Sequence, residues 1–287
     1  MSSTSSATLD SVLADDLSQW PGDSAAAALI TTDGVIASSG DCEAALPWAS
    51  VTKIVAALAV LDVVHDGLLD LDEPAGPPGS TVRHLLGHSS GWAFDEERVI
   101  SAPGTRRIYS NVGIDAVTTL ACERAGAPDH NSLLRQRVLD PAGMTTSTVN
   151  GPASHAGMGP VSDLARLAHE LLAPQALRAD VIEAALTPSY PELSGVLPGF
   201  GRQQPNDWGL GIELRGHKSP HWMPTGVSPL CAGHFGQAGA FLWVDRASGI
   251  GAVAATGVPF GPWAAEAWPV ASQRWLDTWR DMNAGGA

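Results

Sequence analysis

The stretch Ser50-Val-Thr-Lys53-Ile-Val-Ala-Ala-Leu-Ala-Val-Leu-Asp-Val-Val64 is a long apolar segment that begins at a serine and carries a lysine three residues later. The composition predicts a helix that runs to about residue 66, with Gly67 suited to its C-terminal cap. Residues at positions i and i+3 of a helix lie on one face. We therefore expect the Ser50 hydroxyl and the Lys53 amine to be neighbours.

This pair suits an activated serine. A serine hydroxyl is a poor nucleophile until a neighbouring base takes its proton. Lys53 can be that base only when it is neutral, and burial or a helix N-terminus lowers the pKa of a lysine. Lysine is also rare, because Lys53 and Lys218 are the only two in the chain. The alternative is a solvated helix surface, on which a serine and a lysine often occur at this spacing.

Composition limits the possible classes of protein. A chain of 287 residues with 44% hydrophobic content predicts one large domain or two closely packed lobes, and a net charge of −14 argues against binding to nucleic acid or to anionic membranes. The longest apolar run, residues 54–64, is too short to span a bilayer. The N-terminal residues do not resemble a secretory signal, and three widely spaced cysteines suggest free thiols, so we expect a cytoplasmic protein.

Hydrophobic periodicity predicts strands at both ends of the chain and helices between them. The predicted strands span residues 25–32 and 35–39, joined at Asp33-Gly34, and residues 208–215, 238–245 and 250–256. Besides the helix at Ser50, helices are predicted over residues 7–20, 81–86, 115–125, 131–139, 163–172 with Ser162 as N-cap, and 263–282, while residues 188–229 read as long loops.

This pattern predicts an α+β fold, in which one antiparallel sheet is assembled from both chain ends and flanked by helices, with a mainly helical lobe inserted. We expect a single domain over residues 1–287. The sheet lobe is expected to take residues 1–48 and 205–287, and the helical lobe residues 50–190.

Two further stretches carry groups that acyl transfer needs. Tyr109-Ser110-Asn111 follows a Pro-Gly pair and is expected on a loop, where the phenol can pass a proton to a leaving group and the Asn111 amide can orient Lys53 or the substrate. His234-Phe-Gly-Gln237 opens the last strand pair. A strand edge there can offer a backbone N–H to an oxyanion, and Gly236 is expected to let the substrate approach closely.

In this order, the segments resemble the serine β-lactamase and penicillin-binding-protein superfamily, in particular the branch of class C β-lactamases, DD-peptidases and family VIII esterases. The resemblance covers most of residues 48–256. Besides the Ser-x-x-Lys helix, it rests on Gly67-Leu-Leu-Asp-Leu-Asp72, Val82-Arg-His-Leu-Leu-Gly-His-Ser-Ser-Gly91, Pro103-Gly104 with Tyr109-Ser-Asn111, Pro141-Ala-Gly-Met144, and His234-x-Gly-x-x-Gly239 with Trp243-Val-Asp245.

The resemblance implies a role for each of these residues. Ser50 would be the acyl-accepting nucleophile, Lys53 its base and Tyr109 the partner acid and base. Asn111 would position the lysine or substrate and His234 would line the site opposite Tyr109. The backbone N–H groups of Ser50 and Gln237 would form the oxyanion hole. The scheme requires neither a metal nor another cofactor.

Departures from the family pattern bear on the substrate. His234 stands where lactamases and peptidases usually carry a lysine, and Phe235 replaces a small hydroxyl residue, so a binding site for a substrate carboxylate is weakened. We therefore expect an intracellular esterase, amidase or acyltransferase acting on a small, apolar ester or amide, with β-lactamase or DD-peptidase activity as the alternative. Four tryptophans, each also suited to the core, are candidates for the pocket: Trp48, Trp92, Trp208 and Trp222.

Other interpretations remain open at this point. Gly87-His-Ser89-Ser-Gly91 matches the nucleophile elbow of α/β-hydrolases, and Asp207 and His234 follow in the required order, but the elbow needs a preceding strand. The pairs His84/His88 and His217/His221 have a spacing that can bind zinc, although structural roles are favoured. A binding or sensor module that acylates once is the non-enzyme alternative. The sequence does not indicate an oligomeric state.

Overall fold

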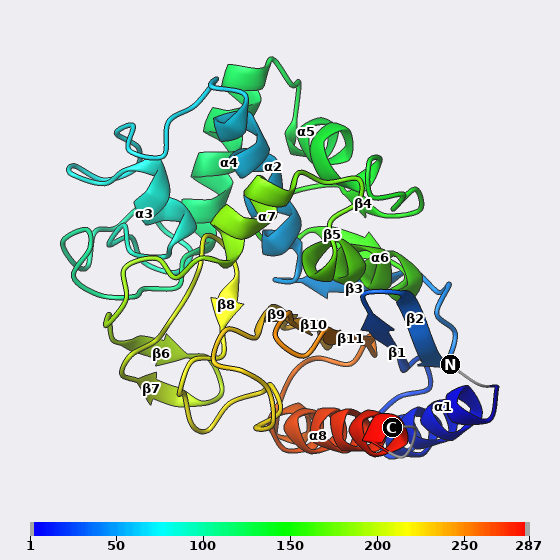
Figure 1. Ribbon diagram of the computed structural model, residues 1–287. Helices are drawn as coiled ribbons and strands as arrows, with labels where there is room; N and C mark the ends of the chain where they lie inside the picture. Colours follow the sequence, from blue (N-terminus) through cyan, green and yellow to red (C-terminus); the bar gives the residue numbers. More distant parts are fainter. Residues whose placement is uncertain (1–2, 285–287) are drawn as a thin grey trace.

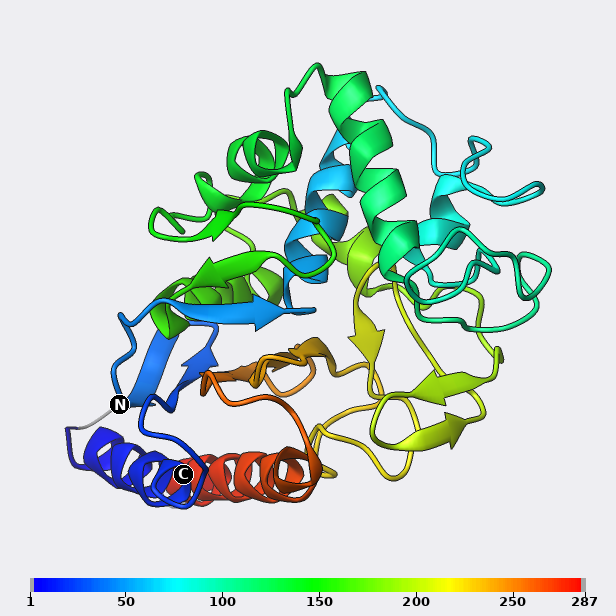
Figure 2. The same cartoon turned by 180° about the vertical axis from the view of Figure 1, so that it is seen from behind.

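The computed structural model describes residues 3–284, whose centre is a six-stranded antiparallel sheet in the order β2-β1-β11-β10-β9-β8 (Figures 1 and 2). The N-terminal hairpin joins the C-terminal strands through direct pairing of β1 with β11. The predicted α+β fold, with an antiparallel sheet built from both chain ends, is confirmed. The strands are β1 (Ala26–Thr31), β2 (Gly34–Ser39), β8 (Glu213–Leu214), β9 (Ala232–Gly236), β10 (Ala240–Asp245) and β11 (Ile250–Ala255).

Helices cover both faces of this sheet and form most of a second lobe, which lies above the sheet in Figure 1. The helices are α1 (Ser3–Leu17), α2 (Thr52–His65), α3 (Val82–Leu86), α4 (Asn111–Ala125), α5 (His130–Leu134), which continues into a π-helical turn η1 (Arg135–Leu139), α6 (Val161–Leu172), α7 (Ala179–Leu186) and α8 (Pro262–Ala284). The remaining short strands are β3 (Leu46–Ala49), β4 (Thr148–Val149), β5 (Gly157–Gly159), β6 (Gly195–Leu197) and β7 (Gly201–Gln203).

The central sheet buries apolar side chains on both faces. Successive side chains of a strand point to opposite sides, and in β1 and β10 both sets are apolar. On one face Leu29, Phe241 and Trp243 belong to a core shared with α1 and α8. On the other, Ile30 and Leu242 belong to a core shared with α6 and the helical lobe. Figures 1 and 2 show α1 and α8 side by side along one edge of the molecule. The sheet thus holds the two ends of the chain and the helical lobe together.

Helix α2 lies inside the helical lobe. Eleven of its residues are buried, so it is apolar all round, as expected of a core helix. It packs against α4, α7 and η1. Strand β3 leads directly into α2 and contacts β9, β10 and β11. The N-terminus of α2 therefore lies where the helical lobe meets the central sheet. Within residues 3–284, none of the helices has the length and apolar content needed to cross a membrane.

Helix α1 begins at Ser3 and not at residue 7, and the predicted starts of α4 and α6 are also wrong. Helix α4 begins at Asn111 and not at residue 115, because Ser110 is an N-cap whose side chain accepts a hydrogen bond from the N–H of Gly113. Helix α6 begins at Val161 with Pro160 as its cap, so Ser162 is not the predicted N-cap. Its hydroxyl instead donates to a carboxylate oxygen of Glu43 at 3.0 Å. The loop containing Tyr109 ends one residue before α4.

The predicted strand over residues 208–215 is also shorter than expected. Only Glu213 and Leu214 pair with β9, because Gly211 has a positive φ of 74° and a turn interrupts the extended chain. The N–H groups of Leu210 and Gly211 bond to carbonyls of α7 and α3 instead of a neighbouring strand. Residues 188–229, predicted as loops, contain the hairpin β6–β7. The very short strands β3, β4 and β5 give no clear alternation in the sequence.

The aromatic core between the sheet and α8 provides a test of the packing. Trp268 is fully buried, whereas Val270 on the same helix is 69% exposed. We expect Trp268→Ala to lower the free energy of unfolding by about 3–5 kcal/mol, because it removes a large buried side chain. Val270→Ala, the control, is expected to change it by less than about 0.5 kcal/mol. Urea denaturation of both variants measures the difference, and equal effects would contradict this description of the core.

Candidate active site

Ser50 lies at a sharp turn between β3 and α2. The preceding residue, Ala49, has a φ of 45°, in the left-handed region that residues with a side chain rarely adopt. The N–H of Val51 donates to the carbonyl of Trp48, and the N–H of Lys53 donates to the carbonyl of Ser50. Strand and helix are thus joined within two residues, and Ser50 is placed on the wall of a cavity. Strained backbone of this kind is concentrated at functional sites.

The side chain of Lys53 is completely buried and points to Ser50, as the i, i+3 spacing predicts. Its amine nitrogen Nζ lies 3.0 Å from Oγ of Ser50, 2.6 Å from Oδ1 of Asn111 and 2.8 Å from the carbonyl oxygen of Ser154. Burial lowers the pKa of Lys53 to about 7. A substantial fraction of this lysine is therefore uncharged at neutral pH, which a general base requires.

The partners of Lys53 determine which way its lone pair points. A neutral amine has two N–H groups and one lone pair, and the carbonyl oxygens of Asn111 and Ser154 can only accept hydrogen bonds. The Asn111 amide is held in this orientation because its Nδ2 donates to Oδ1 of Asp95 at 2.7 Å. With both N–H groups engaged, the remaining position on the nitrogen faces the Ser50 hydroxyl. The geometry thus allows proton transfer from Ser50 to Lys53.

Tyr109 and His234 form the other side of the site. Tyr109 lines the same cavity as Ser50, its hydroxyl lies 3.4 Å from Nε2 of His234, and its ring lies 4.7 Å from Nζ of Lys53. Burial raises the pKa of Tyr109 far above its ordinary value, so the phenol stays protonated. Burial lowers the pKa of His234 to about 3, so its ring is neutral. Its Nδ1 donates to the Phe235 carbonyl at 2.7 Å, which leaves Nε2 to accept from Tyr109.

The two backbone donors predicted for an oxyanion hole are both unoccupied. Within residues 3–284, the N–H of Ser50 and the N–H of Gln237 donate to no other protein group. Gln237 directly follows β9 and lines the same cavity as Ser50, while its side-chain amide is engaged with the Phe260 carbonyl at 2.9 Å. Free N–H groups beside a nucleophile can stabilise the negative charge of a tetrahedral intermediate.

Gly236 has a packing role that was not predicted. A Cβ at this position would lie 2.0 Å from the carbonyl oxygen of Trp48, so only glycine lets β9 approach β3 this closely. The predicted role of this glycine in the approach of a substrate stays a prediction. The contact still matters for the site, because it brings the end of β9, with Gln237, next to the turn that carries Ser50.

The cavity beside Ser50 has a volume of about 210 Å³ and mainly apolar walls. Phe94, on the loop before α4, is 51% exposed and lines the cavity. Phe94, Leu197 and Pro198 were missed as pocket residues, since nothing in the sequence shows that the loop before α4 and the end of β6 reach Ser50. Phe235, which the sequence singled out only as a departure from the family pattern, also lines the cavity. The cavity is lined by Ser50, Phe94, Tyr109, Leu197, Pro198, Trp208, Glu213, His234, Phe235 and Gln237.

Of the four tryptophans predicted for the pocket, only Trp208 lines it. The prediction is wrong for the other three. Trp48 is fully buried beneath the site, and its indole N–H donates to the Gly159 carbonyl at 3.1 Å. Trp222 is buried behind the cavity wall, and Trp92 belongs to the core of the helical lobe. Apolar side chains of this size mostly fill cores, and the sequence does not show which one reaches a cavity.

Glu213 is a charged group of the cavity wall that sequence reasoning missed. Its carboxylate is buried and accepts from Nζ of Lys218 at 2.7 Å, from Nε2 of His221 at 2.9 Å and from Nε1 of Trp222 at 2.8 Å. Burial acts to raise the pKa of Glu213, but Lys218 and His221 outweigh it and hold that pKa below its ordinary value. The sequence contained one signal for it, because Lys218, the second of only two lysines, follows Glu213 by five residues. The charge of Glu213 is thus compensated within the wall.

The structure excludes the nucleophile-elbow interpretation of Ser89. This residue follows helix α3 and not a strand, and its fully buried hydroxyl donates to the His84 carbonyl at 3.4 Å. The strand that must precede the nucleophile elbow of an α/β-hydrolase is therefore replaced by a helix.

The histidine pairs have other partners. His84 bonds to Thr81 in a capping box, and His88 accepts from the N–H of Ser110. His217 is exposed, whereas His221 binds Glu213. Among residues 3–284, no three histidine, cysteine or acidic side chains are placed to hold one metal ion.

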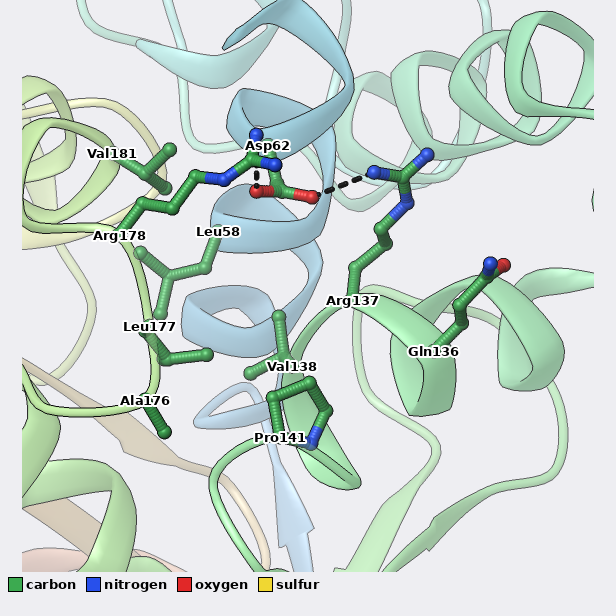
Figure 3. A pocket seen from close by; sticks show the side chains of 10 residues that line it. All are labelled: Leu58, Asp62, Gln136, Arg137, Val138, Pro141, Ala176, Leu177, Arg178 and Val181. Carbon is green, nitrogen blue, oxygen red and sulfur yellow. Dashed lines mark hydrogen bonds and ion pairs between the residues drawn. The ribbon is translucent and has the colours of Figure 1, made fainter. Parts of the chain in front are cut away.

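A second cavity, of about 310 Å³, lies along the C-terminal half of α2 (Figure 3). Its polar part is Asp62, which binds Arg137 at 2.8 Å and Arg178 at 3.3 Å across the cavity. Gln136 and a set of apolar side chains that includes Leu58 and Leu177 form the rest of the lining. None of the lining residues is a serine, threonine, cysteine or histidine, so this cavity offers no nucleophile for acyl transfer.

A serine and a buried lysine one helical turn apart, closed by a tyrosine and a strand edge, define the class of serine acyl-transfer proteins to which β-lactamases and penicillin-binding proteins belong. The chain belongs to the beta-lactamase family, which matches residues 24–272.

Solved structures agree with this membership. A β-lactamase from Mycobacterium bovis, Mb2281c, is 43% identical, with 93% of this chain and 98% of that chain covered and a TM-score of 0.90. Two other neighbours share the fold at 14% identity: the simvastatin synthase LovD from Aspergillus terreus (98% and 100% covered, TM-score 0.74) and EstCE1, a hydrolase with promiscuous acyltransferase activity (97% and 98% covered, TM-score 0.73). No curated protein matches the sequence.

The lowered pKa of Lys53 predicts how modification of Ser50 depends on pH. Only the neutral amine has a lone pair, so the rate of labelling by a fluorophosphonate should rise about tenfold per pH unit below the pKa and level off above about pH 7. Lys53→Arg, which stays charged, should lose this profile and label at least about a hundredfold more slowly. Intact-mass kinetics between pH 5 and 9 measure both. A flat profile in the unmodified protein would contradict the role of Lys53.

Proposed function

We propose that this chain is a serine hydrolase that forms an acyl-enzyme on Ser50 and acts on a small, uncharged ester or amide. The observation that carries this proposal is the 3.0 Å hydrogen bond between Lys53 and Ser50, with Tyr109 beside the amine and on the wall of the same apolar cavity. A nucleophile, a base and a proton donor are thus gathered at one cavity, as acyl transfer by a serine requires.

In the proposed reaction, neutral Lys53 takes the hydroxyl proton of Ser50 while Oγ attacks the substrate carbonyl carbon. The N–H groups of Ser50 and Gln237 stabilise the oxyanion. When the tetrahedral intermediate collapses, the bond to the leaving group breaks and the Tyr109 hydroxyl protonates the departing oxygen or nitrogen. Lys53 then passes the proton it holds to the Tyr109 oxygen, which restores the neutral amine and the phenol beside it. Water, or another acceptor, then attacks the acyl-enzyme by the reverse sequence.

The cavity favours a neutral acyl group. Among residues 3–284, no lysine or arginine lines it, His234 is neutral, and the charge of Glu213 is already compensated by Lys218. A carboxylate bound there would be removed from water without a cationic partner, which is costly. Since an apolar cavity of about 150 Å³ holds benzene, a cavity of about 210 Å³ has room for roughly eight carbon atoms.

β-Lactamase activity is the second candidate, and one observation favours it: the 43% identical relative is described as a β-lactamase. The cavity argues against β-lactams as preferred substrates, because they carry a carboxylate and His234 is neutral. Transfer of the acyl group to an acceptor other than water fits the same chemistry. LovD and EstCE1 share the fold, and the description of EstCE1 names acyltransferase activity.

Labelling distinguishes the proposed nucleophile from the alternatives. We expect a fluorophosphonate to add one adduct to the unmodified protein and to Ser89→Ala, and none to Ser50→Ala, as measured by intact mass. Ser89→Ala is the matched control, because it removes the same hydroxyl from the elbow-like segment. Labelling of Ser50→Ala would refute the proposal. An ester substrate that acylates Ser50 once without turnover would point to a sensor.

A matched pair of esters tests the preference for a neutral acyl group. We expect kcat/KM for p-nitrophenyl pentanoate to exceed that for the mono-p-nitrophenyl ester of glutaric acid by at least about a hundredfold, since burying the unpaired carboxylate costs about 3 kcal/mol or more. The two substrates share the leaving group and differ at the far end of the acyl chain. Equal values, or faster hydrolysis of a penicillin, would favour the β-lactamase candidate.

A further inference from the structure

The two acceptors that hold the N–H groups of Lys53 are themselves held by carboxylates. The Asn111 amide donates to Asp95 at 2.7 Å. Asp115 holds Ser154 at two points, because its Oδ1 accepts from the Ser154 N–H at 2.8 Å and its Oδ2 accepts from the Ser154 hydroxyl at 2.9 Å. Neither aspartate contacts Lys53 directly. Within residues 3–284, the hydrogen-bond partners of its amine are Ser50, Asn111 and Ser154, and it forms no salt bridge.

We propose that Asp95 and Asp115 are positioning residues of the active site, which fix the two acceptors of Lys53 and thereby keep the third position of its nitrogen facing Ser50. The proposal rests on the proposed function, in which Lys53 is the base. Both carboxylates act through another residue, Asp95 through Asn111 and Asp115 through Ser154, and neither touches the substrate cavity.

Helix α4 joins the two arms of this arrangement. Asn111 and Asp115 lie four residues apart, one turn of α4, and so share a face of the helix. Asn111 accepts a hydrogen bond from Lys53 directly. Asp115 instead bonds to Ser154, a buried residue about forty positions further along the chain, whose carbonyl accepts from Lys53. One turn of α4 therefore supplies one acceptor of Lys53 and the carboxylate that holds the other acceptor. Asp95, which lies outside this helix, holds the Asn111 amide from the solvent side.

The charges around Lys53 give these aspartates a measurable signature. Burial lowers the pKa of Lys53, and the carboxylates of Asp115 and Asp95 act against it. The other titratable groups that face Lys53 are Tyr109, His88 and His234, which are buried in their neutral forms, and the exposed His155 bonds to the Ser154 hydroxyl. Removing one carboxylate should make the neutral amine available at lower pH.

The test is the pH profile of fluorophosphonate labelling in Asp115→Asn and Asp95→Asn. At position 95 an asparagine oxygen can still accept from the Asn111 amide. At position 115 the asparagine oxygen can accept from the Ser154 N–H, and its NH2 group can donate to the Ser154 hydroxyl, which then donates to His155, so Ser154 stays held while the charge is lost. We expect the acid limb of the profile to move to lower pH by about one unit in Asp115→Asn, and in the same direction in Asp95→Asn. Asp115→Ala, which releases Ser154, should instead lower the rate at the plateau by about tenfold or more, because the lone pair is no longer directed at Ser50.

Asp33→Asn is the matched control, because Asp33 is exposed on the turn between β1 and β2 and the substitution changes the net charge equally. Its limb should coincide with that of the unmodified protein. Asp95 is exposed, so Asp95→Asn tests the proposal even if Asp115→Asn does not fold. If the acid limbs of the folded variants stay at the pH of the unmodified protein while Ser50→Ala remains unlabelled, the inference about the aspartates is wrong and the proposed function stands. Labelling of Ser50→Ala would overturn the proposed function as well.

Discussion

The burial of one amine, that of Lys53, is the constraint on which the site depends. A charged amine without an adjacent carboxylate is expensive to remove from water. The structure meets this cost by lowering the pKa of Lys53 to about 7 and by surrounding the nitrogen with three oxygen acceptors. Two of these acceptors cannot donate, so the neutral amine is left with its lone pair toward Ser50. The same desolvation keeps Tyr109 protonated and His234 uncharged. One physical effect thus sets the protonation states on which the proposed roles of Lys53, Tyr109 and His234 depend.

This burial is possible only because parts of the chain that are distant in sequence meet at the start of α2. Strand β9 approaches β3 closely enough for the Trp48 carbonyl to occupy the place of a side chain at Gly236. The buried side chain of Trp48 supports the turn from below. The sheet that holds β9 in place is completed by the N-terminal hairpin through β1 and β11. The geometry at Ser50 therefore depends on the pairing of both chain ends.

Charge compensation also shapes the cavity. Glu213, Lys218 and His221 form a buried polar group behind an otherwise apolar wall, with Trp222 completing the hydrogen bonds of the carboxylate. A buried carboxylate is tolerated when its oxygens are satisfied in this way. As a result, Trp208 and Phe235 present apolar surface to the cavity beside a carboxylate whose charge is already balanced. The proposed preference for uncharged acyl groups follows from this lining and not from membership of the beta-lactamase family.

The sequence by itself determined the fold class and the pair at the start of α2, because a 3.6-residue period places Ser50 beside Lys53 and period-two segments at both chain ends require a common sheet. Tyr109, Asn111, His234 and Gln237 were named from ordered motifs, and they meet around Ser50. Only the tertiary structure decided which tryptophan lines the cavity, why β9 needs glycine at position 236, that Glu213 lines the cavity, and that Asp95 and Asp115 bond to the acceptors of Lys53. These depend on contacts between segments far apart in the chain, which no local pattern encodes. A residue's periodicity indicates whether it is buried, but not what it is buried against.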